Sequence, residues 1–168
     1  KKPFILDGDK KLVLNLLPDL VADYRAWEAE RQTASGLFWQ YDVRDAMEES
    51  ISGSRTAQQP RPTINSYMVA NARAIAALAM HANRPALAKE FTAKADTLHR
   101  LMLEKLWDPE AQFFKVLRDS GELSSAREAI GYVPWVFNLP DARHAAAWMQ
   151  FTDPAGFHAP FGLTTAMN

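Results

Sequence analysis

Apolar residues recur at alternating intervals of four and three along the first thirty residues, which predicts an amphipathic helix over 10–32. The members of this apolar stripe are Val13, Leu17, Leu20, Tyr24 and Trp27. Pro18 lies within the stripe and removes one backbone donor. We therefore expect either a kinked helix or two abutting helices, the second with Pro18 in its first turn.

Two further stretches follow the same helical periodicity. The first has Thr63 as its predicted N-cap and carries apolar residues from Ile64 to Ala79. The second begins after the break at Asn83-Arg84-Pro85 and ends near Leu106. Because only a few residues join the two helices, we expect them to pack as an antiparallel hairpin.

Shorter elements are expected in the last third of the chain. Weak alternation and adjacent aromatic residues over 113–117 predict a short strand that pairs back after the turn at Asp119-Ser120-Gly121. Short helical stretches are expected around Trp135 and over 141–151. The pattern as a whole predicts one all-α domain over residues 1–168, with about three antiparallel helix pairs and a short β-hairpin.

The helical pattern is interrupted between residues 34 and 61. Gly36, Gly53 and Pro60 punctuate this stretch, and aromatic residues and carboxylates replace the helical spacing. Connections of this length are uncommon in a compact domain unless they carry function. The segment is therefore the first place to look for a site.

Composition excludes several classes of function. The 168 residues contain 19 Lys and Arg against 20 Asp and Glu, which gives a net charge of -1 without a basic cluster. Nucleic acid and membrane surfaces are therefore not expected as partners. The chain has no cysteine, which excludes disulfides, thiolate metal sites and cysteine nucleophiles. The cellular compartment stays open.

The sequence also lacks the motifs of metal and cofactor chemistry. The four histidines, His81, His99, His144 and His158, never fall three or four residues apart, so no helix face presents a two-histidine metal site. There is no nucleophile elbow, no phosphate-binding loop and no dinucleotide fingerprint. We therefore expect no metal and no cofactor, and carboxylate chemistry remains.

One segment, 39–50, concentrates the groups that such chemistry needs. It contains the carboxylates Asp42, Asp45, Glu48 and Glu49, together with Arg44, Trp39 and Tyr41. Closely spaced carboxylates raise the pKa of one of them, as a general acid requires. Aromatic faces suit the apolar side of a sugar ring. The alternative interpretation is a solvated acidic loop with buried aromatic anchors.

Four sequence blocks in order resemble six-hairpin glycosidases, particularly the mannosylglycerate-hydrolase-like group related to trehalases and processing α-glucosidases. These blocks are 45–53 with 61–68, then 106–109 with 113–114, then 131–135, and finally 157–165. The resemblance implies an (α/α)6 toroid whose loops at one end bind a sugar. It also implies inverting hydrolysis by an acid and a base carboxylate.

The resemblance further implies which residues act. The family's acid loop, similar to Gly-Met-Asp-Asn-Ser, matches Ala46-Met47-Glu48-Glu49-Ser50, so the general acid falls on Glu48. Here alanine replaces the glycine and glutamate replaces the aspartate, which leaves Asp45 and Glu49 as alternative acids. The predicted substrate-binding residues are Trp39, Tyr41, Asp42, Arg44, Arg61, Asn65, Trp135 and Phe161.

Several of these candidates have a second interpretation. Trp135 forms either a wall of the sugar pocket or part of the core. Asn65 binds a sugar, binds an adjoining loop or caps a helix. Arg44 and Arg61 either orient the acid and a substrate hydroxyl or are surface residues.

A complete toroid has twelve helices, about twice the number predicted here. The chain therefore resembles the N-terminal half of a catalytic domain, and the resemblance gives the base to a later hairpin. The expected partners are a saccharide and either the remaining half or a second copy, bound through exposed apolar helix faces. The predicted function is hydrolysis of an α-linked glucoside or mannoside. The alternatives are a non-catalytic carbohydrate-binding relative and a helical scaffold for protein partners.

Because the base is expected outside these residues, the 168-residue chain alone should show no glycosidase activity. An assay of the purified chain with α-glucosides and α-mannosides checks this expectation. A measurable turnover contradicts it.

Overall fold

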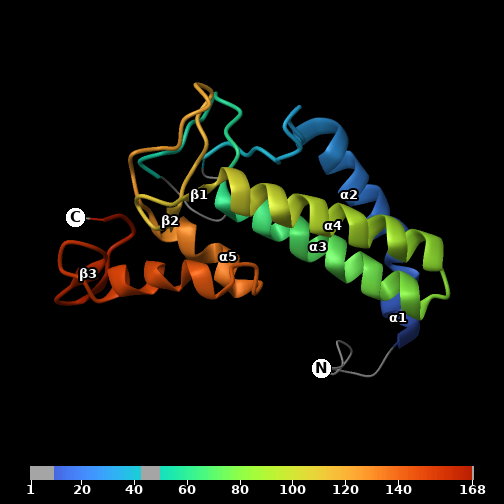
Figure 1. Ribbon diagram of the computed structural model, residues 1–168. Helices are drawn as coiled ribbons and strands as arrows, with labels where there is room; N and C mark the ends of the chain where they lie inside the picture. Colours follow the sequence, from blue (N-terminus) through green and yellow to red (C-terminus); the bar gives the residue numbers. More distant parts are fainter. Residues whose placement is uncertain (1–9, 43–49, 168) are drawn as a thin grey trace.

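The computed structural model describes residues 10–42 and 50–167, and helices dominate it (Figure 1). The helices in chain order are α1 (Lys10–Asn15), α2 (Leu17–Arg31), α3 (Pro62–His81), α4 (Pro85–Lys105), η1 (Ala129–Tyr132), α5 (Val133–Val136) and η2 (Ala142–Phe151). The strands are β1 (Trp107–Asp108), β2 (Phe113–Phe114), β3 (His158–Ala159) and β4 (Gly162–Leu163). Both η1 and η2 are 3-10 helices.

The first predicted helix is two abutting helices, α1 and α2. Pro18 lies in the first turn of α2, where its missing N–H has no partner to lose. Leu17 and Tyr24 of the predicted stripe are buried, whereas Leu20 is 40% exposed. The stripe is therefore buried only where α2 packs against its neighbours.

The centre of the molecule is the antiparallel hairpin of α3 and α4, which lie side by side in Figure 1. Small residues on α3, among them Ala72 and Ala79, are fully buried and let the helices approach closely. Phe91 of α4 is also fully buried and meets the Tyr24 ring edge-on, with ring centroids 5.2 Å apart. This contact joins α2 to the hairpin.

The start of α3 corrects one prediction. The N-cap is Arg61 in an extended conformation, and Pro62 is the first helical residue, so Thr63 is not the cap. Proline is favoured at this position because its φ already suits a helix and its missing N–H costs no hydrogen bond. Asn83, with φ 55°, makes the turn into α4.

The predicted strand over 113–117 has two pairings, one of which was not expected. β2 pairs antiparallel with β1, so that Phe114 lies opposite Trp107. The end of the predicted stretch pairs back after the turn at 119–121, as expected, through an antiparallel bridge between Leu117 and Leu123. Gly131 packs directly against β2, where a β-carbon would overlap the Phe113 ring and the Phe114 carbonyl.

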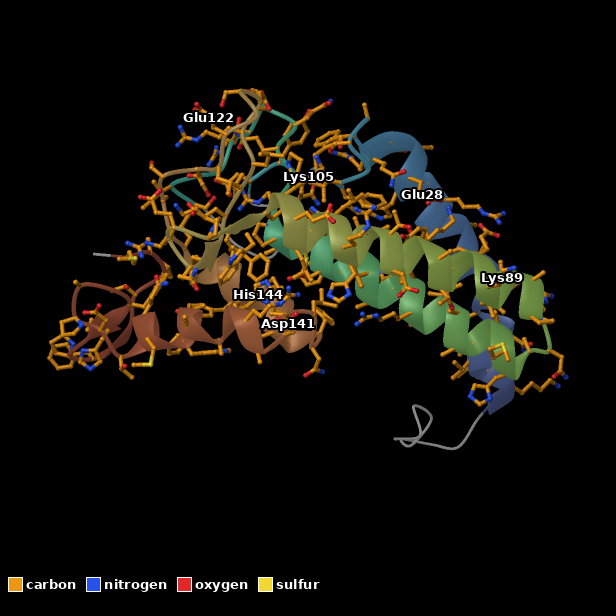
Figure 2. All side chains as sticks on the ribbon, viewed as in Figure 1. Glu28, Lys89, Lys105, Glu122, Asp141 and His144 are labelled. Atoms are coloured by element: carbon orange, nitrogen blue, oxygen red, sulfur yellow. The ribbon has the colours of Figure 1, made fainter. Side chains whose placement is uncertain are left out.

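Short elements complete the C-terminal part, as expected from the sequence. Trp135 lies in α5, and η2 follows with Asp141 as its N-cap. The Asp141 carboxylate accepts a hydrogen bond from the Arg143 N–H at 2.9 Å. The Asp141 N–H in turn donates a hydrogen bond to the His144 ring; both residues are labelled in Figure 2. β3 and β4 then form a second two-stranded hairpin.

The fold is all-α with short antiparallel strands, as predicted. Among the described residues, α3 and α4 form the one long antiparallel pair, with α1 and α2 before it and α5 and η2 after it. Within the described part of the chain, no helix has the length and apolar character that a membrane span needs.

The Asp108 carboxylate stabilises the β1–β2 corner. Partial burial alone raises the pKa of Asp108, but hydrogen bonds from the Lys115 ammonium and the Ala111 and Glu110 N–H groups outweigh it and leave the pKa below its usual value of 3.8. The Lys115 Nζ atom lies 2.8 Å from Asp108 Oδ2. A carboxyl group with a depressed pKa stabilises the fold above its unfolded pKa and loses this contribution as pH falls through the folded pKa.

We therefore expect Asp108→Asn to lower the free energy of unfolding by about 1.5–3 kcal/mol at pH 7, because the buried Lys115 ammonium loses its charged partner. The difference from wild type should disappear in acid, well below pH 3.8. Urea unfolding at the two pH values measures both. The control Glu104→Gln breaks an exposed pair with Arg100 and should cost about 0.5 kcal/mol or less. A constant difference at both pH values would contradict the prediction.

Candidate glycosidase site

The connection between α2 and α3 is fixed to the start of α3 by Asn65. This side chain is fully buried, accepts a hydrogen bond from the Phe38 N–H at 2.8 Å and donates to the Phe38 and Arg61 carbonyls, both at 2.8 Å. An isolated bridge between Trp39 and Pro60 pairs the two arms of the connection. Of the roles predicted for Asn65, the structure shows contact with the adjoining loop.

Asp42 and Arg61 form the centre of the site. The Arg61 Nη2 atom lies 3.6 Å from Asp42 Oδ1 and donates to the Ser50 hydroxyl at 3.1 Å. Ser50 in turn donates from its N–H to Asp42 Oδ2 at 3.1 Å and from its hydroxyl to Oδ1 at 3.0 Å. We call Asp42, Ser50 and Arg61 the anchor triad.

The anchor triad is a buried ion pair with hydrogen-bonding support. Arg61 is 0% exposed and Asp42 is 7% exposed, so Arg61 is not a surface residue. Charges taken out of water are tolerated only when they are paired and their hydrogen bonds are made. The triad also joins residue 42 to residue 50, the two described residues that flank the acidic stretch 43–49.

Gly53 allows this arrangement because it leaves room for the carboxylate. A β-carbon there would overlap both the Asp42 carboxylate and the Ser50 hydroxyl. The Asp42 N–H also donates to the Ser54 carbonyl at 2.8 Å. The chain after Ser50 therefore folds back over Asp42, and only glycine fits at that approach.

Glu128 is a second carboxylate of the site, which the sequence analysis did not single out. It is 5% exposed and accepts hydrogen bonds from the Ile51 N–H at 2.7 Å, the Ser52 N–H at 3.0 Å and the Ser52 hydroxyl. The sequence offered only a weak indication of this role, because Glu128 is a single acidic residue shortly before the block at 131–135. Nothing in the sequence indicates its partners 76 and 77 residues away.

Trp39 and Tyr41 pack together at the edge of the site. Their rings meet edge-on with centroids 4.8 Å apart, and the Arg31 guanidinium lies 4.2 Å from the Trp39 centroid. Trp39 is buried, whereas Tyr41 keeps part of its surface exposed. A cavity of about 410 Å³ opens beside them, lined by Asp23, Ala26, Trp27, Glu30, Arg31 and Gln40.

Trp135 and Phe161 lie in the C-terminal part of the chain. Trp135 is half-buried and packs against Phe114 and Trp148, with ring centroids 5.4 and 5.5 Å away. Phe161 is fully exposed between β3 and β4. Within the described residues, neither side chain has a ring contact or hydrogen bond with the anchor triad.

The remaining predicted residues are those of the acidic stretch. The catalytic candidates Asp45, Glu48 and Glu49 lie outside the described residues, as does Arg44. Over 10–42 and 50–167, no group of three or more His, Asp or Glu side chains is arranged to hold a metal ion.

Comparison with known proteins identifies the family. Residues 3–168 match the family model described as the mannosylglycerate hydrolase MGH1-like glycoside hydrolase domain. The chain belongs to this glycoside hydrolase family. None of the curated proteins compared with the chain is significantly similar to it.

Several solved structures resemble this glycoside hydrolase domain. A protein named sialidase is 44% identical with a TM-score of 0.93, and the match covers 98% of this chain. A GH63 mannosylglycerate hydrolase from Thermus thermophilus, solved with glucose, is 18% identical with a TM-score of 0.77 over 96% of this chain. A GH78 rhamnosidase from Bacillus sp. GL1 is 18% identical with a TM-score of 0.65 over 93% of this chain. The two more distant matches share the fold.

All three relatives are longer than this chain. The match covers 15% of the sialidase, 50% of the mannosylglycerate hydrolase and 16% of the rhamnosidase. The domain therefore corresponds to part of each larger protein.

Substitution of Gly53 tests the geometry around Asp42. We expect Gly53→Ala to lower the free energy of unfolding by about 1–3 kcal/mol, because the added methyl group overlaps the Asp42 carboxylate. Urea unfolding measures the loss, and amide hydrogen exchange should rise at residues 50–54. The control Ser120→Ala lies on an exposed turn and should change stability by less than about 0.5 kcal/mol. Unchanged stability and exchange in Gly53→Ala would show that this close approach is absent.

Proposed function

We propose that this domain carries the general acid of a glycosidase that hydrolyses an α-linked glucoside or mannoside with inversion. The supporting observation is the anchor triad, which joins the two residues flanking a stretch with three carboxylates. A buried attachment made of an ion pair and several hydrogen bonds restricts the positions of the two flanking residues. Acid catalysis needs this restriction, because the proton must be delivered at hydrogen-bonding distance.

Glu48 is the residue we assign as the acid. It occupies the acid position of the family-like string Ala46-Met47-Glu48-Glu49-Ser50, and Ser50 of that string is held by Asp42 and Arg61. Glutamate and aspartate perform the same proton transfer and differ by one methylene in reach. The base that activates water stands on the opposite face of the sugar, roughly 6.5–9.5 Å away. We assign it to a segment outside these 168 residues.

The proposed substrate class rests on the family and on the site's composition. Members of a glycoside hydrolase family cleave bonds to sugars, and one relative of the same fold was solved with glucose bound. Trp27, Gln40 and Arg31 line the 410 Å³ cavity and provide an aromatic side chain, an amide and a guanidinium. Such groups bind the apolar faces and the hydroxyls of a sugar.

The test is Glu48→Gln in the natural gene product that contains this chain. Turnover of an α-gluco- or α-mannodisaccharide should fall by roughly 10²–10⁴-fold, because glutamine cannot donate the proton. Turnover of the corresponding 2,4-dinitrophenyl glycoside should fall much less, since dinitrophenolate leaves without protonation. Both kcat values are measured at saturating substrate.

The matched control is Glu122→Gln, an exposed glutamate on the loop between β2 and η1, labelled in Figure 2. It should leave both kcat values unchanged. Unchanged disaccharide turnover in Glu48→Gln excludes Glu48 as the acid. Asp45→Asn and Glu49→Gln are then compared by the same two substrates.

A further inference from the structure

Glu128 is a buried carboxylate with three donors directed at it. Its Oε1 atom accepts from the Ile51 N–H, and its Oε2 atom accepts from the Ser52 N–H and the Ser52 hydroxyl. Hydrogen bonds to an ionised carboxylate are stronger than those between neutral groups. An acceptor-only side chain is therefore matched to three donors from one short segment.

The backbone of Glu128 is fixed on its other side. Glu128 forms an antiparallel bridge with Ala166, and hydrogen bonds on both sides of it extend this pairing. The Ala129 N–H donates to the Thr165 carbonyl at 2.8 Å, and the Met167 N–H donates to the Arg127 carbonyl at 3.0 Å. Helix η1 begins at the next residue. The carboxylate is thus held by a backbone pair and the start of a helix.

The segment that Glu128 holds is continuous with the anchor triad. Ile51 and Ser52 directly follow Ser50, which binds both Asp42 and Arg61. Gly53, the next residue, lies against the Asp42 carboxylate. Glu128 therefore holds residues 51 and 52, and Asp42 and Arg61 hold the adjoining Ser50.

We propose that Glu128 is a positioning residue for the acid step of the glycosidase reaction. It acts through Ile51 and Ser52 and does not itself transfer a proton to substrate. The inference rests on the proposed function. Glu128 is far from the acidic stretch in sequence. Through its bridge to Ala166, the backbone pairing at 165–167 also contributes to the geometry of the site.

The test compares Glu128→Gln with wild type in the natural gene product. Glutamine has one acceptor oxygen, and its NH2 group only donates, so at least one N–H of Ile51 or Ser52 loses its acceptor. We expect disaccharide kcat to fall about 10- to 100-fold, the scale of a misplaced catalytic group, while the 2,4-dinitrophenyl glycoside kcat changes by about a factor of two or less. Amide hydrogen exchange at Ile51 and Ser52 should become faster.

Ser52→Ala gives a graded comparison. It removes the hydroxyl donor and keeps both N–H donors, so it should show the same selective loss at a smaller size. If Glu128→Gln fails to fold, Ser52→Ala takes its place in the test, because the buried Glu128 carboxylate then keeps its two hydrogen bonds from N–H groups. Glu122→Gln again serves as the surface control and should match wild type in all measurements.

Two results overturn the inference. One is an unchanged ratio of the two kcat values, whether both fall equally or neither falls, and the other is unchanged exchange at Ile51 and Ser52. Glu48→Gln is measured in parallel. If it leaves disaccharide turnover intact, the proposed acid is wrong and this inference falls with it. If Glu48→Gln removes turnover while Glu128→Gln keeps the wild-type ratio, the positioning role alone is wrong.

Discussion

The burial of Arg61 is the constraint on which the site depends. A guanidinium removed from water costs several kcal/mol unless a carboxylate and further acceptors compensate it. Asp42 and the Ser50 hydroxyl supply that compensation. Arg61 is also the N-cap residue of α3, and its carbonyl accepts from the Asn65 amide. One residue thus fixes the start of α3 and the loop before it. Loss of Asp42 would leave an uncompensated buried charge at this junction.

The loop between α2 and α3 is held mainly by polar groups. Its apolar anchors are Leu37, Phe38 and Trp39, all buried at its beginning. Beyond Trp39, order comes from the anchor triad and from Glu128. A buried polar network with its hydrogen bonds made favours one arrangement, because any alternative leaves donors or charges unpaired. Apolar contacts are less directional and tolerate small displacements. The polar attachment therefore restricts the positions of residues 42 and 50–52 more strictly than apolar packing alone would.

Sequence reasoning predicted the elements whose causes are local. The apolar periodicity and the proline breaks located α3 and α4 to within a residue or two, and Pro18 indicated the start of α2. Thr63 was wrong as a cap because the cap preference of threonine lost to Pro62 in the first turn. The return of the chain after the turn at 119–121 was predicted, whereas the pairing of Phe113–Phe114 with Trp107–Asp108 was not. Glu128 was missed because no local pattern indicates donors 76 residues away.

The helices of the fold are determined by local sequence, whereas the site is assembled from residues far apart in the sequence. Helices α3 and α4 join through a three-residue turn, whereas the site brings together residues 42, 50–52, 61 and 128. Relatives of 18% identity share the fold, although one is named a mannosylglycerate hydrolase and another a rhamnosidase. Packing of helices constrains residue size and polarity, while recognition of a sugar constrains particular polar groups. In this chain the helices depend on apolar packing, whereas the loop between α2 and α3 depends on particular polar groups, those of Asp42, Arg61 and Glu128.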